Sequence, residues 1–244
     1  MHIRLAAGVL LCATALITNA ADHAPHWGYG GHGPDTWGEL PGAATCGLGK
    51  EQSPIDIRGA KKSALAPLSF AYSKGSGEVV NNGHTVQVNL ANGGALTVDG
   101  TPYKLVQFHF HTPSEERVEG KVYPMVAHLV HQNADGKLAV VAVLFTEGKA
   151  NAPLAAVFDS LPQHEGAKKP LRAAFDAADV LPADRGYFAF VGSLTTPPCS
   201  EGVRWFVLKE PVTISKAQIS AFRKLYNMNA RPVQPLNGRA IEQT

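Results

Sequence analysis

The chain has 244 residues, of which 45% are hydrophobic and 17% charged, and its formal net charge is +2. This length and composition are compatible with one large globular domain that buries an apolar core, since all-β domains reach this size. Acidic and basic residues are interspersed and form no basic stripe, which argues against a nucleic-acid partner.

The first twenty residues have the pattern of a secretory signal peptide. Residues 1–4 are short and basic, residues 5–17 are almost wholly apolar, and Thr18-Asn19-Ala20 offers the small residues that a signal peptidase reads. The apolar run is too short to span a bilayer comfortably. We therefore expect residues 1–20 to be cleaved, residues 21–244 to form the mature domain without a membrane anchor, and the location to be periplasmic or secreted.

Two cysteines remain after this cleavage, because Cys12 is removed and Cys46 and Cys199 are kept. In an oxidising compartment two cysteines favour a disulfide, and two free buried thiols are the alternative. A bridge that closes a loop of about 150 residues would stabilise the fold by about 5 kcal/mol at most.

Strand patterns dominate the rest of the chain. They cover residues 77–90, 95–98, 103–111, 122–131, 138–145, 187–191 and 203–208, and turn residues such as Asn81-Asn82-Gly83 and Asp135-Gly136 separate several of them. Helical spacing occurs over residues 154–161 and after Ser215, which can cap a helix. We expect one domain that is mainly β (α+β), with a large, twisted, mostly antiparallel sheet and a few peripheral helices.

Potential metal ligands gather between residues 107 and 131. Side chains alternate along an extended strand, so Gln107, His109 and His111 share one face. A second strand around residues 126–130 places His128 on one face and His131 on the other. If the two strands are neighbours, His109, His111 and His128 converge and His131 is left out. Three neutral nitrogen ligands with one open position are typical of a catalytic zinc site.

The same histidines also have a purely structural interpretation, because a His-x-His pair in a strand is often half-buried packing or a surface pair. The third histidine on a nearby strand favours the metal site. Gln107 lies two residues before His109 on the same face, where its amide oxygen can accept the second N–H of that imidazole. Alternatively, Gln107 is a polar residue that meets solvent.

Several segments of the chain resemble the signature segments of α-class carbonic anhydrases. They occur in the order of that family from about residue 27 to residue 239, and they are residues 27–29 (Trp-Gly-Tyr), 52–57 (Gln-Ser-Pro-Ile-Asp-Ile), 81–84 (Asn-Asn-Gly-His), 107–111 (Gln-Phe-His-Phe-His), 114–115 (Ser-Glu), 128–131 (His-Leu-Val-His), 193–198 (Ser-Leu-Thr-Thr-Pro-Pro) and 231–235 (Arg-Pro-Val-Gln-Pro).

The resemblance implies a zinc enzyme that reversibly hydrates carbon dioxide to bicarbonate and a proton. Zn²⁺ would be held by His109, His111 and His128, and hydroxide in the fourth position would attack the substrate. Thr195 would accept a hydrogen bond from the hydroxide and donate one to Glu115. The substrate site would be formed by Val130, Val140, Leu194, Thr196 and Trp205.

Proton export is assigned to His84 by the same resemblance, since the pKa of histidine lies near neutrality. Tyr29, Asn82 and Gln87 would order the intervening water. The resemblance gives no catalytic role to histidines 23, 26, 32, 131 and 164. It also implies that Cys46 and Cys199 form the disulfide, that cis peptide bonds precede Pro54 and Pro198, and that a homodimer is possible.

Two positions depart from the pattern of the family. Val126 stands where a glutamate usually accepts a hydrogen bond from the far nitrogen of the third ligand, here His128, and valine cannot accept one. We therefore expect weaker zinc retention than usual, unless water or a backbone carbonyl substitutes. Glu116 stands where a histidine is common, which we expect to affect stability rather than mechanism.

Two alternatives are compatible with parts of the sequence. One is a catalytically weak zinc-binding member, or a silent binding protein, of the same fold: the silent relatives keep the fold but lose ligand histidines, whereas this chain has all three, together with Thr195 and Glu115. Cupins and zinc hydrolases of other folds also use His-x-His. The hydrolase pattern, however, needs an acid two residues after the second histidine, where this chain has Pro113.

Overall fold

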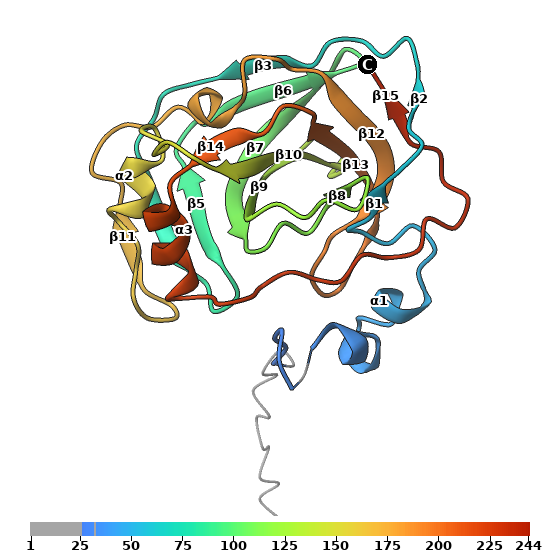
Figure 1. Ribbon diagram of the computed structural model, residues 1–244, viewed down its shortest axis with the longest axis horizontal. Helices are drawn as coiled ribbons and strands as arrows, with labels where there is room; N and C mark the ends of the chain where they lie inside the picture. The colour runs from blue at the N-terminus through green and yellow to red at the C-terminus, as the bar shows by residue number, and fades with distance from the viewer. Residues whose placement is uncertain (1–25, 32) are drawn as a thin grey trace, which may run out of the picture.

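Figure 1 shows the computed structural model of the chain, which describes residues 26–31 and 33–244. The predicted signal peptide, residues 1–20, lies outside the described residues, as do His23 and His32. None of the helices in the described part is long and apolar enough to cross a membrane.

A large twisted sheet fills the centre of the molecule, and short helices lie at its periphery (Figure 1). Two strands, β1 (Asp56–Ile57) and β8 (Arg117–Val118), form a separate parallel pair. The strands of the main sheet are β2 (Lys61–Lys62), β3 (Ser69–Tyr72), β4 (Gly77–Asn81), β5 (Val86–Leu90), β6 (Gly94–Val98), β7 (Thr101–His111), β9 (Met125–Gln132), β10 (Leu138–Glu147), β11 (Lys168–Pro170), β12 (Tyr187–Ser193), β13 (Glu201–Leu208), β14 (Val212–Ile214) and β15 (Glu242–Gln243).

The order of strands in the main sheet is β11-β4-β5-β7-β9-β10-β13-β12-β15-β2, with β6 paired to β7 and β3, and β14 paired to β10. Most neighbours are antiparallel, but β10 runs parallel to β13 and β14, and β15 runs parallel to β2. The prediction of a mainly β domain on a large, mostly antiparallel sheet is confirmed, and the parallel pairs are an addition to it.

The strand pattern over residues 77–90 is divided by a tight turn. Asn82 Oδ1 accepts hydrogen bonds from the backbone N–H groups of His84 at 3.0 Å and Thr85 at 2.9 Å. Gly83 has a φ of +88°, which glycine adopts without the steric cost of a Cβ. The two halves are therefore the antiparallel hairpin β4–β5, and His84 lies at its tip.

The helix predicted after Ser215 is confirmed as α3 (Lys216–Arg223). Ser215 Oγ accepts the backbone N–H of Gln218 at 3.2 Å, and the Gln218 side chain accepts the backbone N–H of Ser215 at 3.1 Å. This reciprocal capping box satisfies two donors that the first turn leaves free. Ile219 and Phe222 on the inner face are buried.

The other helical pattern, over residues 154–161, gives only the short helix α2 (Ala155–Phe158), and Leu161 is buried after that helix has ended. Helices α2 and α3 lie together at one side of the sheet (Figure 1). The remaining helical segments are η1 (Pro34–Glu39), α1 (Thr45–Leu48) and η2 (Ala177–Val180).

Alternating side chains on the central strands face two separate apolar cores. Phe108 and Leu129 pack in the larger core, to which α2 and α3 also contribute. Val126, Val130 and Trp205 pack in a smaller core on the other face. Because the predicted metal ligands share this second face, the smaller core forms an apolar wall next to them.

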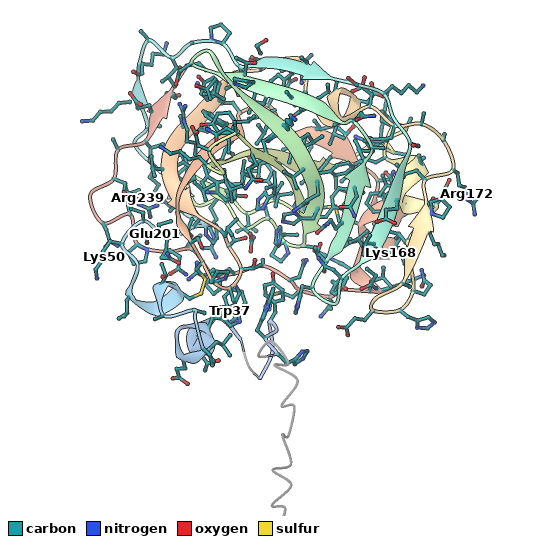
Figure 2. The ribbon with its side chains drawn as sticks, turned by 180° about the vertical axis from the view of Figure 1, so that it is seen from behind. Trp37, Lys50, Lys168, Arg172, Glu201 and Arg239 are labelled. Carbon is teal, nitrogen blue, oxygen red and sulfur yellow. A yellow bond between two sulfur atoms is a disulfide. The ribbon has the colours of Figure 1, made fainter. Side chains whose placement is uncertain are left out.

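A disulfide ties the N-terminal segment to the loop between β12 and β13. Cys46 in α1 is bonded to Cys199, with their Cα atoms 5.0 Å apart, so the predicted bridge is confirmed. Trp37 of η1 packs in the same small cluster and is fully buried. Figure 2 shows Trp37 at the lower rim of the molecule, close to the sulfur–sulfur bond.

Among the residues that the structure describes, three peptide bonds that precede proline are cis. The bonds at Ser53-Pro54 and Pro197-Pro198 were predicted to be cis, and that prediction is confirmed. The third, at Thr112-Pro113, was not predicted and directly follows His111.

Candidate metal centre

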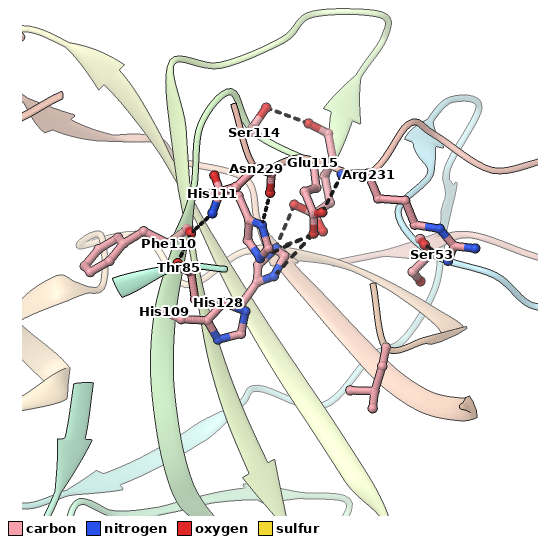
Figure 3. Close-up of polar contacts among 12 residues, drawn as sticks. Ser53, Thr85, His109, Phe110, His111, Ser114, Glu115, His128, Asn229 and Arg231 are labelled. Carbon is pink, nitrogen blue, oxygen red and sulfur yellow. Dashed lines mark hydrogen bonds and ion pairs between the residues drawn. The ribbon is translucent and has the colours of Figure 1, made fainter. Parts of the chain in front are cut away.

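The pairing of β7 with β9 brings the three predicted ligands together. His109 is the direct cross-strand partner of His128, and His111 is the partner of Val126. One potential ligand nitrogen from each of His109, His111 and His128 lies within 4.8 Å of the others. Figure 3 shows the three imidazoles converging from the two strands. The predicted juxtaposition is therefore present.

Neutral acceptors fix the Nδ1 atoms of the first two ligands, His109 and His111. Nδ1 of His109 lies 2.9 Å from Oε1 of Gln107, and Nδ1 of His111 lies 2.7 Å from the backbone carbonyl oxygen of Asn229. Both partners are acceptors, so each Nδ1 carries the proton. Nε2 of each ring is left with a lone pair for a metal, and the hydrogen bond predicted for Gln107 is present.

The third ligand, His128, is hydrogen-bonded through Nε2 rather than Nδ1. One expectation from the sequence is wrong at this residue. His128 was expected to lack a partner for its far nitrogen, because Val126 cannot accept a hydrogen bond. Instead, Nε2 of His128 lies 3.1 Å from Oε2 of Glu116. Glu116 comes from the loop between β7 and β8 and is fully buried. Nδ1 of His128 is therefore the nitrogen left for a metal.

Burial keeps the first two histidines neutral. It lowers the pKa of His109 to about 3 and the pKa of His111 well below its ordinary value, and the nearby His128 adds to both shifts. Burial also lowers the pKa of His128, but Glu116 and Glu115 raise it by more. Burial therefore favours the neutral form of His109 and His111, whereas the two carboxylates favour the protonated form of His128.

Glu115 lies beside the ligands and is fully enclosed. Its Oε1 accepts the backbone N–H of Arg231 at 2.8 Å, and its Oε2 lies 3.5 Å from Nε2 of His111. Burial raises the pKa of Glu115 to about 8, while His128, the Arg231 N–H and a hydrogen bond with the side chain of Thr195 lower it. A bound dication would favour the ionised carboxylate.

The chemistry of this pocket fits a cation. Among the described residues, Nε2 of His111 and Oε2 of Glu115 are buried polar atoms without a hydrogen-bond partner. An unpaired buried acceptor is costly unless a proton or metal satisfies it. Three imidazole nitrogens with an adjacent carboxylate suit a divalent metal such as Zn²⁺.

A cleft of about 120 Å³ leads from the ligands to the β4–β5 turn. His84 lies at this end, with its ring stacked on Trp27 at a centroid distance of 3.6 Å and an interplanar angle of 7°. Burial lowers the pKa of His84, and Glu165 partly opposes that shift. The predicted residues that line the cleft with His84 are Tyr29, Asn82, Gln87, Gln107, His109, His111 and Thr196.

Two contacts in the cleft concern residues predicted to order water. Asn82 donates a hydrogen bond from Nδ2 to Oε1 of Gln87 at 3.4 Å. Gln87 is the cross-strand partner of His109, so its side chain lies between the turn and the ligands. Burial and the nearby Glu115 raise the pKa of Tyr29, which remains a protonated hydroxyl.

The predicted substrate wall is a row across four strands. Gln107 pairs with Val130, Val130 with Val140, and Val140 with Trp205. Val130, Val140 and Trp205 are buried, and the indole N–H of Trp205 donates to the Ser193 carbonyl at 3.0 Å. Leu194, which is partly buried, packs against the same core. In this row, Gln107 and Val130 lie two residues from His109 and His128 along their strands, on the same face of the sheet.

His131 lies apart from the cluster, as predicted. Its Nδ1 donates to the Ala139 carbonyl at 3.2 Å, and its Nε2 accepts from the hydroxyl of Tyr72 at 2.7 Å. Burial lowers the pKa of His131 to about 4. Both nitrogens are satisfied, so this histidine is a neutral core residue.

Sequence reasoning missed three contributors to the site. Glu116 was assigned to stability, although a valine at 126 together with a glutamate at 116 was a detectable signal that the acceptor had moved. The Asn229 carbonyl and the stacking of Trp27 on His84 left no such signal, because both come from irregular segments.

Comparison with known proteins places the chain in one family. The family model for eukaryotic-type carbonic anhydrases matches residues 32–244. A carbonic anhydrase of Pectobacterium atrosepticum is 44% identical over 236 residues, which cover 96% of this chain and 97% of that protein.

Two solved structures are similar over nearly the same region. The α-carbonic anhydrase of Thermovibrio ammonificans in complex with the inhibitor sulfanilamide is 49% identical, with a TM-score of 0.87 over 89% of this chain and 98% of that one. The α-carbonic anhydrase of Photobacterium profundum is 51% identical, with a TM-score of 0.85 over 89% and 100% of the two chains.

Proposed function

The chain belongs to the eukaryotic-type, or α-class, carbonic anhydrase family, and on that premise we propose that it hydrates carbon dioxide reversibly at a Zn²⁺ site. The observation that carries the proposal is the set of three imidazoles, each with one potential ligand nitrogen within 4.8 Å of the others. Nε2 of His109, Nε2 of His111 and Nδ1 of His128 would hold the metal, and three such ligands would leave a position for the reacting water.

Zinc in such a site acts as a Lewis acid that lowers the pKa of bound water to about 7, a value known for carbonic anhydrases as a class. The residues around it supply binding and orientation. Because His109 and His111 are neutral, they leave the charge of the metal largely uncompensated.

Thr195 and Glu115 orient the reacting oxygen. Ionised Glu115 has only acceptor atoms, so the Thr195 hydroxyl donates to it and keeps its own lone pairs for the proton of the reacting water. The backbone N–H of Arg231 donates to the other oxygen of Glu115 and thereby fixes the direction of this series of hydrogen bonds. A correctly aimed nucleophile needs less reorganisation in the transition state.

The apolar wall binds the substrate. Carbon dioxide is small and nonpolar, and Val130, Val140 and Trp205 present buried apolar surface one register step from the ligands. Leu194 and Thr196 complete this substrate site on the side of the loop that follows β12.

His84 carries the product proton to solvent. It shares the cleft with His109, and Tyr29, Asn82 and Gln87 line the path between them. Its lowered pKa favours release of the proton to the bulk at neutral pH. The stack on Trp27 gives the ring a resting position at the outer end of the cleft.

We propose a periplasmic or secreted location for the protein. The Cys46–Cys199 disulfide supports a periplasmic or secreted protein, because disulfides persist in oxidising compartments. The export signal is assigned to residues 1–20, which the structure does not describe. A homodimer remains a prediction, which light scattering on the purified protein tests.

Stopped-flow measurement of carbon dioxide hydration, with zinc measured on the same samples, tests the proposal. The His109→Ala variant should lose zinc and activity together. The His164→Ala variant is the matched control, because His164 is an exposed histidine outside the cleft, and it should behave like the wild type. Full hydration by zinc-free His109→Ala protein would contradict the proposal.

A further inference from the structure

The surroundings of His128 give Glu116 a role in the metal centre. We propose that Glu116 is a positioning residue: its carboxylate holds the Nε2–H of His128 and thereby directs Nδ1 toward the metal. This inference rests on the proposed zinc site. Its tests measure metal retention and the protonated nitrogen of the ring rather than carbon dioxide hydration.

The contact between His128 and Glu116 is close and buried. Nε2 of His128 lies 3.1 Å from Oε2 of Glu116, with which it is hydrogen-bonded, and 3.1 Å from Oε1, which has no hydrogen-bond partner among the described residues. Glu116 is fully buried and His128 is 1% exposed. A buried carboxylate is retained only where a donor or a cation compensates for its lost hydration. The His128 N–H is such a donor.

The loop that carries Glu116 is braced on both sides. Ser114 Oγ donates to the Glu116 carbonyl at 2.8 Å and accepts the backbone N–H of Tyr123 at 3.0 Å. On the other side, the Arg117 N–H donates to the Ile55 carbonyl at 3.2 Å, where β8 pairs with β1. The carboxylate is therefore held in place before any metal binds.

The strand that bears His128 does not provide this acceptor. Val126 lies two residues before His128 on the same face and is the cross-strand partner of His111. Its side chain is fully buried in the smaller core with Ile55 and Leu144. A loop residue therefore supplies the hydrogen bond that position 126 cannot make.

The acceptor also differs in kind from those of the other two ligands. Gln107 offers an amide oxygen to His109, and Asn229 offers a backbone carbonyl to His111. A carboxylate makes a stronger, charge-assisted hydrogen bond and raises the basicity of the ligand that it holds. Removal of Glu116 should therefore weaken metal retention more than removal of the Gln107 amide.

The rate of zinc release to excess chelator tests the proposal. Glu116→Ala should release zinc about 10–100-fold faster than the wild type, whereas Glu116→Gln, which keeps an oxygen acceptor, should lose less. Gln107→Ala should fall between the wild type and Glu116→Ala. The matched control is Glu119→Gln, since Glu119 is a nearby carboxylate on the other side of β8 with a side chain 66% exposed. Equal release from Glu116→Ala and Glu119→Gln would overturn the proposal.

A second measurement uses only the wild-type protein and so does not depend on whether a variant folds. Nitrogen-15 spectra of the histidine rings in the zinc-loaded protein should show His128 protonated at Nε2 and metal-bound at Nδ1, the reverse of His109 and His111. One common pattern for all three rings would overturn the proposal. Zinc held in the expected pattern without carbon dioxide hydration would contradict the proposed function and still support the role of Glu116.

Discussion

His109 and His128 are direct partners across the antiparallel ladder between β7 and β9, with ring centroids 5.5 Å apart and ring planes at 86°. Both strands lie inside the main sheet, since β7 also pairs with β5 and β9 with β10. Two of the three ligands are thus fixed by backbone hydrogen bonds, and the third, His111, follows on the same face of β7. We infer that the ligand geometry is largely formed before the metal binds.

The first prediction concerns the hydroxyl of Thr195. Thr195→Val should lower kcat/KM for carbon dioxide hydration by about 10²-fold or more, because it removes the donor to Glu115 and the acceptor for the proton of the reacting water. Thr195→Ser, which keeps the hydroxyl, should remain much closer to the wild type. Stopped-flow kinetics at equal zinc content compare them. Equal rates for the two variants would show that the hydroxyl has no orienting role.

The second prediction concerns proton export through His84. His84→Ala should slow turnover in weak buffer and leave it little changed in strong buffer, and added imidazole should restore the lost rate. Burial lowers the pKa of His84, so the acid limb of turnover should lie below pH 6.5, where the neutral ring is lost as pH falls.

The nearby carboxylate of Glu165 allows the direction of this pH dependence to be tested. Glu165 raises the pKa of His84, so Glu165→Gln should move the acid limb to still lower pH. Turnover measured against pH in weak buffer gives the position of the limb. A shift to higher pH, or full turnover of His84→Ala in weak buffer, would rule out His84 as the shuttle.

Much of this site follows from strand periodicity alone. The alternation over residues 107–111 and 126–130 predicts that His109, His111 and His128 share a face and that His131 does not. Periodicity does not give the register, so the pairing of His109 with His128 rather than with a neighbour emerges only from the fold. The family resemblance placed Thr195 and Glu115, which lie 80 positions apart in the chain.

Irregular segments account for what was missed or wrong. Glu116 reaches His128 because hydrogen bonds at Ser114 and Arg117 set the path of a loop, and no local pattern encodes that path. The stack of Trp27 on His84 likewise depends on how the N-terminal segment packs against the sheet. The prediction for His128 considered Val126 alone, whereas the hydrogen bonding of His128 depends on the residue at position 116.

A third prediction follows for position 126. Because Glu116 already serves His128, Val126→Glu in the wild-type background should not slow zinc release to a chelator. It should lower the thermal stability, since it places a second carboxylate in a fully buried apolar position. Val126→Leu is the apolar control. Slower zinc release from Val126→Glu would show that the acceptor at Glu116 is insufficient.

A fourth prediction concerns the disulfide. Loss of the Cys46–Cys199 bond, which spans 153 positions in sequence, should lower the free energy of unfolding by about 2–5 kcal/mol. Cys199 closely follows Thr195 and Thr196, so activity at elevated temperature should fall before activity at room temperature. Unfolding and thermal inactivation with and without reductant measure both effects. Identical inactivation in the two conditions would refute a structural role.

The most direct test of a three-histidine zinc enzyme is a titration of zinc into chelator-stripped protein, followed by stopped-flow carbon dioxide hydration. Hydration should rise in proportion to added zinc and stop rising at one zinc per chain. A protein that binds one zinc per chain and hydrates carbon dioxide no faster than buffer alone would contradict this account.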